Sequence, residues 1–374
     1  MRLHQRSLLR TVAAGIVMCM MFGATACFGH DSPDERPTAS ASTSEQTSPI
    51  TVVASVNQWG SLAEQIGGTY VKVTSILNST SVDAHDFEPK TADVAALQKA
   101  QVVVSNGAGY DAWATKNLTK GTVSVSAAQM VGAMEGDNPH LWFSNDARNA
   151  MAKELADTYS RIMPARKKYF AGKLSAWNKR ESKVEKAMKT FSSTHKGATY
   201  AATEAVAYYL LSDMGFDDKT PEGYAQSAAS DAEPAPADLQ AFQELLEKHQ
   251  VDLLVNNVQE ASDATNLLTG TAQKSDVPVF DVTEQMPADQ SSLTSWILSL
   301  VTSLTETMAT TDAEDDSSEN ATSSPSESSE SASPSENATE EPQPDPGNYR
   351  RRRSPRLALR MVLPAIITGN TPSY

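Results

Sequence analysis

Apolar runs of strand length alternate with segments of helical spacing from Ile50 to Ala309. A run such as ITVVASV, at residues 50–56, is typical of a buried strand. Segments such as TADVAALQKA, at 91–100, have helical spacing and separate these runs. Strands that alternate with helices predict a parallel sheet and an α/β fold. The strand-like runs cover residues 50–56, 71–77, 101–109, 198–203, 251–258 and 277–282.

The middle of the chain has a different pattern. Residues 145–191 carry apolar side chains at helical spacing over a long distance, and Pro164 divides them. Because proline suits the first turn of a helix, one helix is predicted from about Pro164 to Met188, about 40 Å long at ~1.5 Å per residue. We expect a helical segment at 148–190 that includes this linker and joins an N-terminal lobe at 50–147 to a C-terminal lobe at 191–309.

The two ends of the chain carry signals for targeting rather than folding. Residues 1–26 have the basic, apolar and small-residue regions of a secretory signal. They lead to Cys27 in a sequence that resembles a bacterial lipoprotein box, so lipidation of Cys27 is expected; soluble secretion and an uncleaved anchor are the alternatives. Residues 27–49 are predicted to be a flexible tether. The acidic, Ser-rich tail at 310–374, with its basic end, is predicted to be disordered.

Charge and cysteine content exclude several classes of function. The formal net charge of −15 at pH 7 and the pI of about 4.9 disfavour a nucleic-acid partner, which needs a basic face. Cleavage before Cys27 would leave one thiol in the chain, so neither an internal disulfide nor a Cys-based metal site is expected. Two interpretations stay open for the basic end at 350–374: contact with anionic lipid, and absence of this segment from the mature protein.

Two of the six histidines lie where a ligand site is expected. His85 follows the second strand run, and His140 lies in the loop sequence GDNPHLWF ahead of a helix. Ligands of parallel α/β folds bind at the carboxyl ends of strands, where such loops converge. Imidazole is a good ligand for zinc and other first-row divalent ions. A metal site and ordinary capping or packing roles are both open for these residues, whereas His195 is expected to be structural.

Two motifs resemble those of a known family. HDFEPKTADVAALQKAQVVVSNGAGYDAW, at 85–113, and NPHLWFSNDARNA, at 138–150, resemble the first and second motifs of the zinc and manganese solute-binding lipoproteins of bacterial ABC importers. VNNVQ and TEQMP resemble an actinobacterial branch of that family. The resemblance covers about residues 50–309. It implies two lobes with mainly parallel sheets flanked by helices, one long linking helix, and a metal site in the cleft between the lobes.

The resemblance also implies a set of four metal ligands. His85 and His140 match the histidines of the two motifs, and Glu204 matches a ligand at the start of the first helix of the second lobe. The fourth ligand is an acid after the last strand, either Glu284, which is favoured, or Asp281. Two imidazoles and two carboxylates suit zinc, manganese or iron. We favour zinc over manganese, although residues 115–137 hold none of the histidines of a zinc-buffering loop.

The function implied is that of a receptor rather than an enzyme. A monomer, lipid-anchored to the outer face of the cell membrane, would capture a divalent metal and deliver it to the permease of an ABC importer. One alternative is a secreted metal-dependent hydrolase, but the motifs H-E-x-x-H and G-x-S-x-G are missing from the sequence. Another alternative is a surface adhesin with a structural metal, which the Ser-rich tail suggests.

Overall fold

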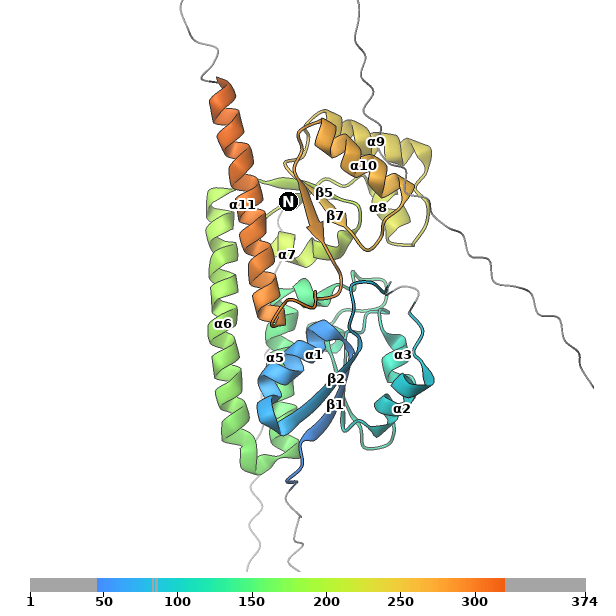
Figure 1. The fold of residues 1–374 in the computed structure, drawn as a ribbon, viewed down its shortest axis with the longest axis vertical. Coiled ribbons are helices and arrows are strands. Elements are labelled where there is room, and N and C mark those ends of the chain that lie inside the picture. Colours follow the sequence, from blue (N-terminus) through green and yellow to red (C-terminus); the bar gives the residue numbers. More distant parts are fainter. Residues whose placement is uncertain (1–45, 83, 85–86, 320–374) are drawn as a thin grey trace, which may run out of the picture. The chain divides into compact units, whose positions relative to one another are not determined.

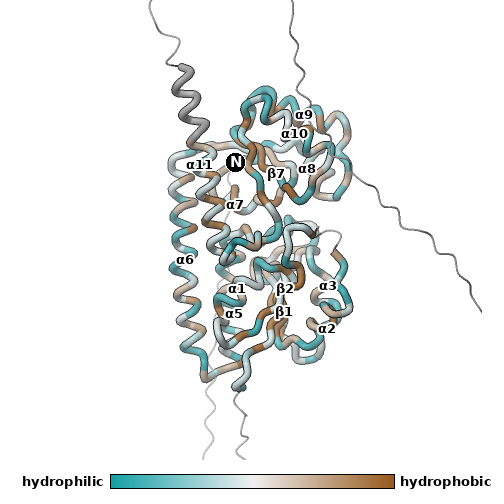
Figure 2. The backbone as a smooth tube through the Cα atoms, viewed as in Figure 1, coloured by the Kyte–Doolittle hydropathy of each residue, from teal (hydrophilic) through white to brown (hydrophobic). Residues whose placement is uncertain are grey.

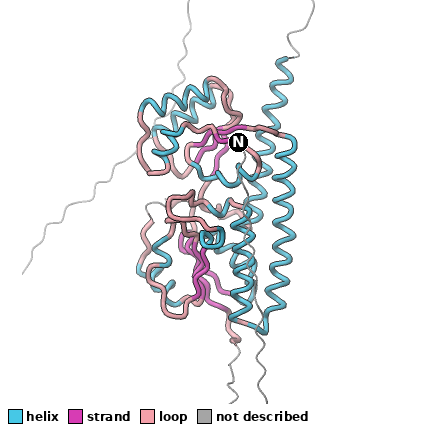
Figure 3. Tube along the Cα trace, turned by 180° about the vertical axis from the view of Figure 1, so that it is seen from behind, coloured by secondary structure: helices cyan, strands magenta, loops and turns pink. Residues whose placement is uncertain are grey.

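Two four-stranded parallel sheets follow one another along the chain (Figure 1). The structure, a computed structural model, describes residues 46–82, 84 and 87–319. The predicted signal, Cys27, His85 and residues 320–374 therefore lie outside the described residues. Both sheets belong to one compact unit, which ends at Ser318. The expected α/β class is confirmed, and Figure 3 shows the two groups of strands with their helices.

The first sheet has the strand order β2-β1-β3-β4 and is covered on both faces. Val52 lies opposite Val73 of β2 and Val102 of β3. Because side chains alternate along a strand, Val52 packs in the core with α1, whereas Val53 packs with Leu97 of α2. The elements of this lobe are β1 (Ile50–Val56), α1 (Asn57–Gly67), η1 (Gly68–Tyr70), β2 (Val71–Leu77), α2 (Thr91–Lys99), β3 (Val102–Ser105), α3 (Ala112–Thr115), β4 (Val123–Ser126), α4 (Ala127–Val131) and η2 (Leu141–Phe143).

The second sheet repeats this arrangement with the order β6-β5-β7-β8. Ala201 lies opposite Leu254, and Val255 lies opposite Phe280. In both sheets the order reverses beside the first strand of the lobe, which is where α/β folds bind ligands. The elements are β5 (Thr199–Ala202), η4 (Ala205–Ala207), α7 (Tyr208–Asp213), β6 (Asp217–Asp218), α8 (Glu222–Ala228), α9 (Pro236–Glu247), β7 (Leu254–Asn257), α10 (Asp263–Lys274), β8 (Val279–Val282) and α11 (Leu293–Glu319).

Long helices join the two sheets. Helix α5 (Asn145–Ile162) leads through a 3-10 turn, η3 (Pro164–Arg166), into α6 (Lys167–Thr194). With 28 residues, α6 is about 42 Å long at ~1.5 Å per residue. Phe170, near its start, packs edge-on against Tyr70 of the first lobe, and Phe191, near its end, stacks on Phe216 of the second. The predicted linker helix is thus present, beginning three residues later and ending six residues later than expected.

One apolar cluster extends across both lobes and the linking helices. Trp59 of α1, Trp177 of α6 and Trp296 of α11 are all buried in it. Figure 2 shows apolar residues gathered in strands such as β1 and β2, and a mixture of polar and apolar residues along α6. Fully burying one large apolar side chain stabilises a fold by about 1.5–3 kcal/mol, so these tryptophans are major contributors. A second, smaller cluster around Phe242 and Leu254 belongs to the second lobe alone.

The last helix is longer than the sequence pattern indicated. Helix α11 continues to Glu319, ten residues beyond Ala309, where the acidic tail was expected to begin. Its N-terminal half carries the apolar residues that enter the core, including Leu293, Ile297 and Leu304. Among the described residues, no helix combines the length and the apolar character that a membrane crossing requires.

Candidate metal centre

His140 is held in place by the residues on either side of it. Its backbone N–H and its ring Nδ1 both lie 3.0 Å from Oδ1 of Asn138. Asn106, at the end of β3, donates a hydrogen bond of 2.6 Å to the carbonyl of Pro139. The ring of Trp142 packs edge-on against the imidazole, with centroids 5.4 Å apart. These contacts fix both the position and the orientation of a side chain that is only 3% exposed.

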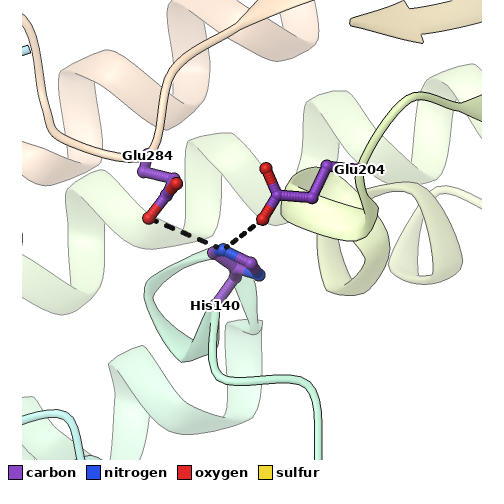
Figure 4. A group of neighbouring side chains, drawn as sticks. All are labelled: His140, Glu204 and Glu284. Atoms are coloured by element: carbon purple, nitrogen blue, oxygen red, sulfur yellow. Dashed lines mark ion pairs between the residues drawn. The ribbon is translucent and has the colours of Figure 1, made fainter. Parts of the chain in front are cut away.

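The free nitrogen of this imidazole faces two carboxylates. Nδ1, when it carries the proton, donates to Asn138 Oδ1 and leaves a lone pair on Nε2. That Nε2 atom is buried and has no hydrogen-bond partner among the described residues. It lies 3.7 Å from Oε1 of Glu204 and 3.8 Å from Oε2 of Glu284 (Figure 4). A lone pair that faces two carboxylates across this gap is unfavourable without a cation between them.

The two carboxylates come from the carboxyl ends of strands in the second sheet. Glu204 follows β5 and precedes η4, and Glu284 lies in the turn after β8. Asn257, the last residue of β7, lies between them, and its Nδ2 donates to Glu204 Oε2 at 2.6 Å and to Glu284 Oε1 at 3.3 Å. Gln259 Oε1 accepts the backbone N–H of Glu284 at 2.8 Å. The oxygens that Asn257 binds are the ones turned away from His140.

Tyr110 reaches this group from the first lobe. Its hydroxyl donates a 2.7 Å hydrogen bond to Oε2 of Glu284 and accepts one of 3.0 Å from Gln285 Nε2. Burial, followed by the negative charge of Glu284, raises the pKa of Tyr110 well above its usual value. The hydroxyl therefore keeps its proton and remains a donor to the carboxylate at neutral pH.

His140, Glu204 and Glu284 together have the composition of a metal site. One ligand atom each from His140, Glu204 and Glu284 lies within 4.8 Å of the others. Ligands of a tetrahedral zinc ion, bound at roughly 2.0–2.1 Å, stand about 3.4 Å apart, which is close to the separations of 3.7 and 3.8 Å found here. Two carboxylates and a neutral imidazole would offset the charge of a divalent ion.

The other residues that the sequence pointed to are placed differently. Asp281 is an exposed residue of β8, and its Oδ1 accepts a hydrogen bond from Asn256 rather than facing His140. His195 directly follows α6, and its ring stacks on Phe191 with the ring centroids 4.2 Å apart. His85 lies outside the described residues, but its neighbour Ala84 lines the cavity beside His140. That cavity, of about 450 Å³, is also lined by Tyr110 and Glu204.

A family of known proteins matches most of the folded region. The sequence model of the family described as zinc-uptake complex component A, periplasmic (ZnuA), matches residues 52–307. The match spans both sheets and both long helices between them.

The names of several curated relatives refer to metal binding or metal transport. The zinc-binding lipoprotein AdcA of Streptococcus pneumoniae is 24% identical over 59% of this chain, and the match covers 48% of AdcA. The metal ABC transporter substrate-binding lipoprotein ScbA of Streptococcus cristatus is 23% identical, over 64% of this chain and 81% of ScbA. The manganese-binding lipoprotein MntA of Bacillus subtilis is 32% identical, over 31% of this chain and 41% of MntA. The chain thus spans about half the length of AdcA.

Solved structures share the fold. The laminin-binding adhesin Lmb of Streptococcus agalactiae superposes with a TM-score of 0.59 at 17% identity, over 69% of this chain and 99% of Lmb. The periplasmic zinc-binding protein TroA of Treponema pallidum superposes with a TM-score of 0.59 at 13% identity, over 70% of this chain and 99% of TroA. The two-lobed architecture with its long helix is therefore a known one, found in proteins described as metal-binding and as adhesive.

Proposed function

Because the chain belongs to the ZnuA family of zinc-uptake components, we propose that it captures a divalent transition metal, zinc or manganese, outside the cytoplasm and delivers it to an ABC importer. The observation that carries this proposal is the buried Nε2 of His140, which faces Glu204 and Glu284. A metal ion is the partner that such an atom lacks. The protein acts as a receptor, and the ion is its cargo rather than a cofactor.

The ligand set that we propose is His140, Glu204 and Glu284, completed by His85. Glu284 rather than Asp281 supplies the second carboxylate, because its oxygen lies 3.8 Å from the imidazole while Asp281 is exposed. His85 is proposed from its sequence motif, and the position of Ala84 at the cavity supports it. Tyr110 and Asn257 then orient the carboxylates without binding the metal, as outer-shell partners do.

Zinc is the ion that this arrangement favours. Asn257 binds Oε2 of Glu204 and Oε1 of Glu284, so only the other oxygen of each carboxylate is turned toward His140. In Glu284 that oxygen also accepts the hydrogen bond from Tyr110. This favours one metal bond per carboxylate and a total of four ligands. Four-coordinate tetrahedral geometry is typical of zinc, whereas manganese suits octahedral oxygen-rich sites.

We propose that the protein works at the outer face of the cell membrane, anchored through lipid on Cys27 with residues 27–49 as a tether. A lipid anchor would keep the receptor close to the importer. The family match disfavours a metal-dependent hydrolase, because the family consists of uptake components. The adhesin alternative rests on likeness of fold alone, since the identity to Lmb is 17%.

Competitive titration with zinc and manganese on the full-length protein tests the ligand set. We expect one equivalent of bound zinc, and a loss of most of the affinity in His140→Ala, Glu204→Gln and Glu284→Gln. Asp281→Asn is the matched control, because it neutralises an acid three residues from Glu284 that is exposed. A chain that binds no stoichiometric metal would refute the proposed function, and an equal loss in Asp281→Asn would refute the choice of Glu284.

The delivery step needs a separate test in cells. A strain that lacks the protein is expected to grow poorly when a chelator limits zinc, and the wild-type gene is expected to restore growth. His140→Ala, produced at the same level, is expected to fail. Full rescue by this variant would separate the protein's role in growth from its metal site.

A further inference from the structure

Arg148 of α5 and Glu181 of α6 form an ion pair that solvent does not reach. Their side chains are 0% and 1% exposed, and Arg148 Nη2 lies 2.7 Å from Glu181 Oε1. Nε of the same guanidinium donates to this oxygen at 2.8 Å. A buried ion pair is often no more stabilising than apolar side chains of similar size. Stability alone therefore does not account for two charges at this position.

The same arginine holds the segment that carries His140. Its Nη1 donates hydrogen bonds to the carbonyl of Phe143 at 2.8 Å and to that of Trp142 at 3.2 Å. The ring of Trp142 in turn packs against the imidazole of His140 at 5.4 Å and an interplanar angle of 88°. A continuous set of contacts thus runs from Glu181 through Arg148 and Trp142 to the candidate ligand.

Helix α6, which carries Glu181, packs on both lobes. Phe170 near its start lies against Tyr70, with centroids 6.1 Å apart, and Phe191 near its end lies against Phe216 at 5.0 Å. Glu181 is located between these two contacts. A displacement of one lobe against the other would therefore act on α6, and through Glu181 on the segment that carries His140.

We propose, building on the function proposed above, that the Arg148–Glu181 pair couples the linker helix to His140 and so sets how firmly the site retains its metal. Arg148 and Glu181 are positioning residues in this proposal, because they act through Trp142 and do not touch the ion. A pair that served packing alone would change the stability of the protein with and without metal by equal amounts. It would leave the rate of metal release unchanged.

The test is the rate of zinc release in the full-length protein, measured by stopped flow with an excess of a chromogenic chelator. Arg148→Met combined with Glu181→Leu removes both charges, so that neither is left buried and unpaired. We expect zinc release at least about tenfold faster than in the wild type, the usual scale for loss of an outer-shell partner. Thermal unfolding of the metal-free variant is recorded alongside, to separate release from stability.

The matched control is a more exposed ion pair within α5, the helix that carries Arg148. Arg161 Nη2 lies 2.7 Å from Glu154 Oε1, with the side chains 60% and 28% exposed. Arg161→Met combined with Glu154→Leu makes the same chemical changes and is expected to release zinc at the wild-type rate. A release rate in the buried-pair variant that equals the rate in this control would overturn the proposal.

A second variant keeps the proposal testable if the buried-pair variant does not fold. Arg148→Lys retains the positive charge beside Glu181 but loses the planar fork that reaches the carbonyls of Trp142 and Phe143. Faster zinc release in this variant supports the coupling, and an unchanged rate refutes it. A wild-type protein that binds no zinc would refute the proposed function itself. A wild-type protein that binds zinc, with variants that release it at the wild-type rate, would refute only the coupling through Arg148 and Glu181.

Discussion

Asn257 is the residue on which both carboxylates of the candidate site depend. Its side-chain amide donates a hydrogen bond to Glu204 and another to Glu284. Asn257→Ala is expected to lower zinc affinity by about 10–100-fold, the scale reported for loss of outer-shell partners. Competitive titration measures the change. Asn256→Ala is the matched control, because the amide of Asn256 binds the exposed Asp281, and an equal loss there would contradict the assignment.

Tyr159 makes stability sensitive to alkaline pH. Burial raises the pKa of this tyrosine far above its usual value, and its hydroxyl donates only a long hydrogen bond of 3.4 Å to the carbonyl of Ala63. The pKa of Tyr159 in the folded state thus lies above its unfolded value of about 10. The neutral hydroxyl therefore makes its full contribution to the free energy of unfolding below pH 10, and this contribution is lost as the pH rises further.

The corresponding variant is Tyr159→Phe. We expect the free energy of unfolding, followed by urea titration, to fall less steeply between pH 10 and pH 11 than in the wild type. At pH 7 the variant should lose no more than about 1 kcal/mol, since one weak hydrogen bond is removed. If the free energy of unfolding falls equally steeply in the variant and the wild type between pH 10 and pH 11, other buried groups determine the alkaline pH dependence.

Single residues of the site differ in how far sequence could predict them. His140, Glu204 and Glu284 lie in motifs with a recognisable order, and the structure brings these three together. Asp281 and Glu284 could not be separated by sequence, because only the fold shows that one is exposed and the other buried. The sequence carried one weak indication of the role of Asn257. Neighbouring side chains of a strand point to opposite faces of the sheet, so only one of Asn256 and Asn257 could contact the site.

At the level of elements, α6 derives its stability from the side chains that it buries. Trp177 is fully buried on this helix, and its replacement by alanine leaves a large cavity. Trp177→Ala is expected to cost about 3–5 kcal/mol in free energy of unfolding, measured by urea denaturation. Lys179→Ala, an exposed change on the same helix, should alter stability by less than about 0.5 kcal/mol.

Elements with a strong periodic pattern were predictable, and short ones were not. The helix around Trp177 was expected because apolar residues recur at helical spacing over many turns. Strands β4, with sequence VSVS, and β6, with sequence DD, were not expected. Two to four residues carry too little pattern to be distinguished from a loop. Their pairing partners, β3 and β5, define them as strands.

For the molecule as a whole, metal binding and folding are expected to be linked. The candidate ligand atoms come from both lobes, so the unfolded chain would hold no formed site. Zinc at about 100 times its Kd is expected to stabilise the protein by roughly 2.7 kcal/mol. Calorimetry with and without a chelator measures this as a shift in Tm. His140→Ala should show no shift, and a shift equal to that of the wild type would place the bound ion elsewhere.

The plan of two lobes and a long helix was predictable from the sequence, but the contacts that join the lobes were not. Asn138 contacts the ring of His140 through its Oδ1 atom, and its Nδ2 donates a hydrogen bond of 2.7 Å to the carbonyl of Ala205 in the second lobe. Asn57 of α1 donates a hydrogen bond of 2.7 Å to the carbonyl of Met286. Such contacts depend on how two separately folded sheets meet, which no local pattern in either half encodes.

The order in which the candidate ligands occur along the chain also determines when the site can first exist. His140 precedes the linker helix, whereas Glu284 follows β8, the last strand of the second sheet. During synthesis, or during export in an unfolded form, the histidine is present long before the second carboxylate can reach it. The site is complete only after β8 has paired with β7. A newly made chain would therefore stay empty until nearly all of it has folded, and would load its metal where folding finishes.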